Sequence, residues 1–162
     1  MGTCVMPTTA VTMRDVRVVA SDPARNLLCQ RFSPDERWIS FMAVDSARRD
    51  VSTLYVMPAN GGSWIPMTEG ESYDDKPRWS PDGRVLYFLS ARDGTLNLWG
   101  RRFDPDRGTT IGNPFRVTSF HGTGHGVAGE LARVEIAISA NRLFLPITES
   151  AGTIWMLEGV DR

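Results

Sequence analysis

The sequence predicts an all-β chain made of about three repeated, four-stranded antiparallel units. Three observations predict it: a motif that recurs along the chain, short apolar segments spaced by about ten residues, and turn-forming residues between those segments. Hydrophobic residues make up 41% of the 162 residues and charged residues 23%, a composition typical of one globular domain. We expect this domain over residues 16–162, after a disordered or loosely ordered N-terminus over residues 1–15.

The repeated motif is an aromatic or apolar residue, a Ser-Pro-Asp turn and an apolar strand. The first copy begins at Phe32, the second begins 47 residues later at Trp79, and an eroded third copy begins at Ile138 without the proline and the aspartate. Each copy is followed by a second apolar segment that ends in an aromatic residue: Tyr55, Trp99 and Trp155. Because the copies keep their register through two strands, the motif indicates a repeated structural unit.

The turn of the motif has a local physical cause. Proline presets φ to about −65° at the second position of a type I turn, and glycine adopts the positive φ that returns the chain into an antiparallel strand. Glu36 stands in the first copy where the second has glycine, so we expect a strained or differently shaped turn there. The predicted structural turn residues are Ser33, Pro34, Asp35, Ser80, Pro81, Asp82 and Gly83.

The strands after these turns are nearly continuous apolar runs, which indicates burial on both faces. A repeat of this length with about four strands has the size of a propeller blade, in which sheets stack radially around a channel. The sequence therefore predicts a partial β-propeller with blades at about residues 24–70, 71–120 and 121–162. The expected strands are Gln30–Phe32, Trp38–Val44, Ser52–Pro58, Trp64–Thr68, Lys76–Ser80, Arg84–Ser90, Leu96–Arg102, Phe115–Ser119, Val134–Ser139, Arg142–Thr148 and Thr153–Glu158.

The third blade has three expected strands, and Val16–Ala20 is the candidate for its missing outer strand. We expect this segment to pair with a third blade, either its own or that of a twofold partner. Three blades also leave two apolar sheet faces uncovered. We expect a larger propeller, or a second copy in a homodimer that closes a six-bladed ring, to cover them.

The strand that ends in Trp79, the turn Ser80–Arg84 and the apolar strand after it resemble the TolB-type propeller repeat. The resemblance covers about Pro23–Glu158, and the copy at Phe32 departs from it at Glu36. It implies a propeller that usually closes with six or more blades. Such propellers occur in extracytoplasmic binding proteins, in the non-catalytic half of prolyl-oligopeptidase-like peptidases and in bacterial kinase sensor regions. The resemblance favours a periplasmic location, although the N-terminus shows no signal peptide.

Composition and motifs argue against several classes of function. The formal net charge of −1, without runs of either sign, predicts no nucleic-acid partner, and no apolar segment is long enough for membrane insertion. The few cysteines and histidines lie apart, so we expect no metal site. Gly124–Gly129 matches the dinucleotide fingerprint, but the alternating residues of Val134–Ile138 follow it instead of a helix, so we expect no cofactor. We find no nucleophile elbow and predict no enzymatic activity.

The candidate binding residues lie on three equivalent connections between blades. In a propeller, the connection from an outer strand to the next inner strand lines one mouth of the channel, and loops on a rigid scaffold carry recognition. The three loops are Asp22–Leu28, Glu69–Asp75 and His121–Gly129. Their candidate binding residues are Arg25, Asn26, Tyr73, Asp74, Asp75, His121 and His125.

The sequence thus predicts a non-catalytic propeller segment that binds a protein or peptide partner. One alternative is the substrate-gating propeller part of a prolyl-oligopeptidase-like peptidase. Another is the sensor propeller of a bacterial Ser/Thr kinase. A third is a truncated product without an independent function.

Overall fold

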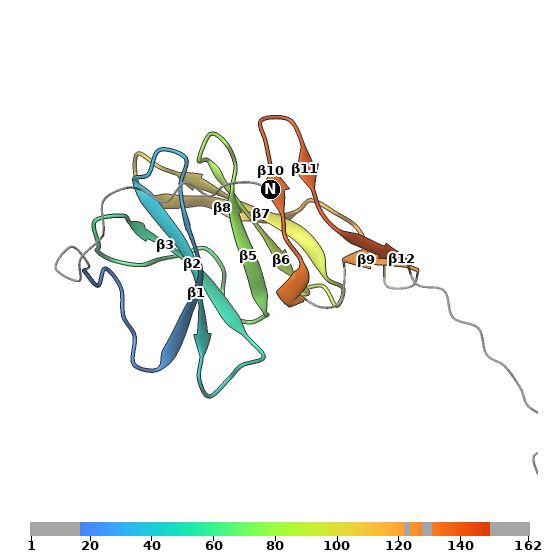
Figure 1. The fold of residues 1–162 in the computed structure, drawn as a ribbon, viewed down its shortest axis with the longest axis horizontal. Coiled ribbons are helices and arrows are strands. Elements are labelled where there is room, and N and C mark those ends of the chain that lie inside the picture. Colours follow the sequence, from blue (N-terminus) through green and yellow to red (C-terminus); the bar gives the residue numbers. More distant parts are fainter. Residues whose placement is uncertain (1–16, 122–123, 128–130, 150–162) are drawn as a thin grey trace, which may run out of the picture.

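The computed structural model describes residues 17–121, 124–127 and 131–149, and their architecture is all-β as predicted (Figure 1). The first sheet is antiparallel and four-stranded, in the order β1 (Arg25–Phe32), β2 (Trp38–Asp45), β3 (Ser52–Pro58) and β4 (Ile65–Pro66). Its outer strand is shorter than the expected Trp64–Thr68. A strand proline donates no ladder hydrogen bond, and Pro66 is the last residue of β4.

The second sheet repeats this arrangement with β5 (Asp74–Trp79), β6 (Val85–Ser90), β7 (Asn97–Asp104) and β8 (Thr109–Arg116). The expected outer strand Phe115–Ser119 is wrong in its start, because a tight turn returns the chain at once into β8. The Asp104 carboxylate accepts the amides of Asp106 and Arg107, and Gly108 has a φ of 63°.

The third unit is smaller in the described part of the chain. It contains β9 (His125–Val127), the short 3-10 turn η2 (Leu131–Arg133), β10 (Ala137–Ile138), β11 (Leu143–Phe144) and β12 (Ile147–Glu149). β10 pairs with β11, and β12 pairs with β9. The expected continuous strand Arg142–Thr148 is therefore wrong: it is divided at Pro146, which has no amide for a ladder. The expected strand Thr153–Glu158 lies outside the described residues.

The expected outer strand Val16–Ala20 is also wrong. Residues 17–20 form no strand, and Val16 lies outside the described residues, as does the expected disordered segment 1–15. Ala20 packs instead beside the cluster of Phe41, Ala43 and Met57 on the first sheet. The apolar contact of this segment with the first sheet is made by Ala20, while Val18 remains 80% exposed.

The turns of the repeat keep one geometry in both sheets. Ser33 Oγ donates to Asp35 Oδ1 at 2.6 Å, and Ser80 Oγ donates to Asp82 Oδ1 at 2.5 Å. Glu36 has a φ of 59° where Gly83 has 69°, and both amides donate to the serine carbonyl at 2.9 Å. Two outcomes were expected for the turn at Glu36, a strained backbone or a different shape. The backbone is strained, and the shape is the same as that of the second turn.

The largest apolar cluster lies between the two sheets. β2 and β3 contribute Met42, Val44, Leu54 and Val56, while the second sheet contributes Trp79, Leu86, Phe88 and Phe103. A second cluster joins Leu89 and Leu98 to the third unit. Both faces of the second sheet are therefore covered, which explains its continuous apolar strands. Figure 1 shows the three units side by side, from the blue and cyan first sheet to the orange third unit.

Candidate functional site

Several predicted binding residues lie in strands and not in loops. Arg25 and Asn26 pair with Asp45 and Val44 within the first sheet, and His125 belongs to β9. Asp74 and Asp75 likewise pair with β6 as the first residues of β5. The inner strands begin earlier than expected because their first residues are polar, and the apolar pattern does not mark polar strand residues. Tyr73 and His121 remain outside the strands.

Arg25 is fixed by contacts within the first sheet. Its guanidinium donates to Asp22 and to the Tyr55 hydroxyl, both at 2.9 Å, and its Cζ lies 5.2 Å from the Trp64 ring centroid. The Arg25 hydrogen bond holds the pKa of Asp22 below its ordinary value. These contacts tie the segment before β1 to the sheet, whereas Asn26 beside them is exposed.

Asp74 is buried and links the second sheet to the first. Both of its carboxylate oxygens accept from Arg92 at 3.2 Å, and Ser52 of β3 bridges the Asp74 backbone, donating to its carbonyl at 2.6 Å and accepting its amide at 2.7 Å. Arg92 also pairs with Glu69 at 3.3 Å. Asp74 therefore has a structural role. It also borders a polar hollow of about 350 Å³ at the mouth of the channel where the sequence predicted binding.

The two inner strands meet at Cys29 and Asp75. The Cys29 thiol donates to Asp75 Oδ1 at 3.6 Å, and the same oxygen accepts the Lys76 amide at 2.6 Å. Burial, and then the nearby Asp75 charge, raise the pKa of both the Cys29 thiol and the Tyr73 phenol. The thiol and the phenol are therefore neutral hydrogen-bonding groups near pH 7.

Both strands have a bulge at this place. The register shifts between Leu28 and Arg31 in β1 and between Asp75 and Arg78 in β5. Within the bulges, Cys29 and Lys76 have left-handed φ values of 58° and 55°. A bulge redirects the side chains beside it.

Glu135 connects the third unit to this surface. Its carboxylate forms an ion pair with Arg78 and lies 3.9 Å from Lys76 Nζ. Arg78 Nε also donates to the Ile136 carbonyl at 3.1 Å. We define the inner-strand cluster as Cys29, Tyr73, Asp75, Lys76 and Glu135.

The structure gives the two histidines different partners. His121 Nε2 lies 3.1 Å from Ser119 Oγ, and His125 Nε2 lies 3.4 Å from Glu149 in the paired strand β12. Among the described residues, no group of three or more His, Cys, Asp or Glu side chains is placed to hold a metal ion.

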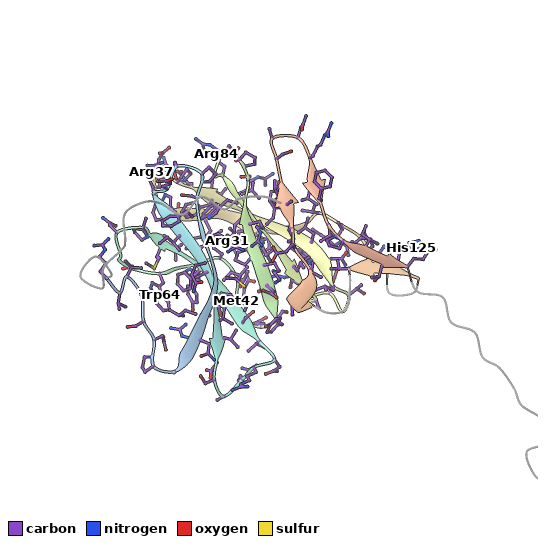
Figure 2. The ribbon with its side chains drawn as sticks, in the orientation of Figure 1. Arg31, Arg37, Met42, Trp64, Arg84 and His125 are labelled. Carbon is purple, nitrogen blue, oxygen red and sulfur yellow. The ribbon has the colours of Figure 1, made fainter. Side chains whose placement is uncertain are left out.

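Sequence reasoning missed Cys29, Lys76, Arg31 and Arg78 as residues of the inner surface. The repeat contains the signal that could have found them. The offset of 47 residues that relates Phe32 to Trp79 also relates Cys29 to Lys76 and Arg31 to Arg78. Figure 2 shows Arg31 near the centre of the view. The two inner strands that carry these residues, β1 and β5, are in contact.

No family model matches the chain. An uncharacterized protein of Agrobacterium fabrum is 36% identical over 73 residues, which cover 45% of this chain and 24% of that protein. An uncharacterized peptidase of Bacillus subtilis is 44% identical over 43 residues, which cover 26% of this chain and 6% of the peptidase. The chain thus spans about a quarter or less of these relatives.

Two solved structures resemble the fold. The structure of a puromycin hydrolase variant in complex with PGG matches 86% of this chain, and the match covers 21% of the hydrolase chain. The TM-score is 0.62 and the sequence identity is 23%. A putative TolB from Agrobacterium tumefaciens matches 82% of this chain and 48% of its own, with a TM-score of 0.52 and 21% identity. The chain therefore has a TolB-like β-propeller fold, and its two four-stranded sheets are blades. Among the described residues, no helix is long and apolar enough to cross a membrane.

Proposed function

We propose that this chain is a non-catalytic propeller segment that binds a protein or peptide partner at its inner strands. The observation that carries the proposal is the inner-strand cluster, in which polar side chains of two blades and the third unit meet, from the buried Asp75 to the exposed Glu135. Convergent polar groups on a rigid scaffold are typical of a binding site.

The chemistry of the cluster suits recognition better than covalent catalysis. Its most nucleophilic group, the Cys29 thiol, has a raised pKa, so little thiolate forms at neutral pH. Lys76 and Glu135 provide charges of both signs, and β1 and β5 are the end strands of their sheets. Peptides and protein loops bind to such mixtures of charges and open strand edges.

The proposal includes the completion of the ring. Phe32 is 62% exposed on the first blade, whereas the equivalent Trp79 is 8% exposed because the first blade covers it. The open face also contains a hollow of about 500 Å³ lined by Leu27, Ile39 and Phe41. An apolar face of this kind becomes covered, either by a further blade of a larger propeller or by a second copy.

Site-specific photo-crosslinking tests the binding proposal. A photoreactive amino acid is placed at exposed Asn26 or Glu135, and in a control at Arg107, whose side chain is 83% exposed in the turn between β7 and β8. We expect both inner positions, and not Arg107, to form the same adduct in an extract of the source cells. Equal labelling from all three positions, or no adduct from the inner two, contradicts the proposal.

A second candidate is the substrate-gating propeller part of a peptidase, and the similarity to the B. subtilis peptidase favours it. Sequencing of the adjoining coding region tests it, since a nucleophile elbow in frame with this chain is expected. An extracytoplasmic location belongs to our proposal on the basis of the TolB-like fold. Cell fractionation with an antibody against the chain checks that location.

A further inference from the structure

We propose that a groove at the ends of β1, β5 and β10 binds an extended peptide segment through an internal acidic side chain, which Arg31 holds. This inference rests on the proposed binding function and assigns it a second surface. The groove lies at the mouth formed by the Ser-Pro-Asp turns, opposite the mouth predicted from the sequence.

Equivalent positions of the three repeats form the groove, which has a volume of about 470 Å³. Its walls include Arg31, Phe32 and Pro34 of the first repeat, Trp79 and Pro81 of the second, and Ala140 of the third. Trp79 lines the groove although the first blade covers it to 8% exposure. A residue at this position can thus be covered by a neighbouring blade and still line the groove. We therefore expect the groove to persist when a further blade covers Phe32, the residue equivalent to Trp79.

Charge complementarity selects an acidic ligand. The lining contains two guanidinium groups, those of Arg31 and Arg78, and no carboxylate. Arg78 has a partner in Glu135. Arg31 is exposed, donates to the Gln30 carbonyl at 2.8 Å, and has no carboxylate within ion-pair distance among the described residues.

The repeat explains why Arg31 lacks an internal acid. The third copy follows the second at an offset of 59 residues, from Trp79 to Ile138, so Glu135 corresponds to Lys76 in the second repeat. The position that would hold the partner of Arg31 is thus occupied by a cation. A planar guanidinium binds a carboxylate with two parallel hydrogen bonds, which makes the acidic side chain of a partner the fitting ligand.

The shape of the groove selects an internal side chain over a chain end. Pro81 and Ala140 of the groove also border a hollow beside β6, away from the open face of the first blade. A ligand held at Arg31 therefore has room to continue beyond the groove. The aromatic and proline walls of the groove suit leucine and proline residues on either side of the acid.

Fluorescence polarisation with three labelled peptides tests the inference on the 162-residue chain. The first peptide is amidated and has one central glutamate flanked by leucine and proline. The second replaces the glutamate with glutamine, and the third is this glutamine peptide with a free C-terminal carboxylate. We expect the glutamate peptide to bind about tenfold tighter than both others, as one charge-assisted contact provides.

Arg31→Gln is expected to abolish the preference for the glutamate peptide, and Arg31→Lys is expected to keep part of it. The control is Arg48→Gln, which removes an exposed cation between β2 and β3 and is expected to keep the full preference. Circular dichroism verifies the fold of each variant. Equal binding of the peptides, an unchanged preference in Arg31→Gln, or Arg31-dependent binding of the free carboxylate overturns the inference. If the crosslinks from Asn26 and Glu135 persist in that case, the proposed function stands without this groove.

Discussion

Cys29 and Lys76 have the same left-handed backbone conformation at the same position of successive inner strands, with φ values of 58° and 55°. Neither residue is a glycine, so each bulge costs about 1–2 kcal/mol of backbone strain. The Asp75 carboxylate offsets part of this cost in β5 by accepting the Lys76 amide. In β1 the corresponding residue is Leu28, which has no carboxylate. The bulge is therefore a property of the repeat and not of one residue.

Replacing Glu36 with glycine is expected to stabilise the chain by about 1 kcal/mol, because glycine adopts the φ of 59° without a Cβ clash. The free energy of unfolding in urea measures the effect. Gly83→Ala at the equivalent turn is the matched control and is expected to destabilise by a similar amount. A lower stability of Glu36→Gly would show that its side chain has a role that the turn geometry does not reveal.

The pH dependence of stability is expected to include a contribution from the first turn. The Ser33 hydroxyl, and then the Arg37 guanidinium, lower the pKa of Asp35 from 3.8 to about 2. A carboxyl with a lowered pKa in the folded state adds stability above its unfolded pKa and loses it as the pH falls toward its folded pKa. Urea unfolding between pH 5 and about pH 2 should show a smaller decrease in Asp35→Asn than in the unchanged chain. Identical pH profiles would contradict this assignment.

Asp74→Asn is expected to destabilise the chain by about 2 kcal/mol, because it removes the buried carboxylate partner of Arg92, which then keeps only the more exposed Glu69. Thermal and urea unfolding measure the loss. Asp93→Asn is the control, since the Asp93 pair with Arg116 is more exposed and is expected to contribute less than about 1 kcal/mol. Similar losses in the two variants would argue against a structural role for Asp74.

Gly108→Ala is expected to cost about 1–3 kcal/mol more than Gly112→Ala. Both glycines have left-handed φ values, of 63° and 64°, so both substitutions carry the same backbone strain. A Cβ on Gly108 would lie 2.6 Å from the Trp38 ring of the first blade, whereas a Cβ on Gly112 would meet nothing within 4 Å. Urea unfolding of the two variants isolates the packing of the β7–β8 turn against Trp38. Equal losses would show that the ring moves aside at little cost.

The repeat predicted the parts of the fold that local chemistry determines. The serine, proline and aspartate of each turn, and the apolar strands that follow, occur as expected at Ser33 and Ser80. The predicted starts of the inner strands, Gln30 and Lys76, were wrong. The strands begin at Arg25 and Asp74, where ladder pairing and an ion pair hold polar residues that no apolar pattern marks. Val16–Ala20 was wrong as a strand: residues 17–20 pair with no strand, and Ala20 packs on the face of the first sheet instead.

The candidate site was less predictable than the fold. The sequence selected loops, whereas the inner-strand cluster depends on two bulges whose left-handed residues are a cysteine and a lysine. Neither residue type favours that conformation, so tertiary pairing imposes it. Only the superposition of the repeats, which places Arg31 over Arg78, could have indicated the groove.

The position of the main apolar cluster between the sheets also determines how the chain unfolds. Each blade packs its apolar residues against those of its neighbour. The stability of the chain therefore depends on the contacts between neighbouring blades, as in a short one-dimensional array. The first blade and the third unit each have fewer described couplings than the second blade, which shares an apolar cluster with each of them. We therefore expect both to unfold before the second blade, and any further blade packed on the first to raise the cooperativity of unfolding.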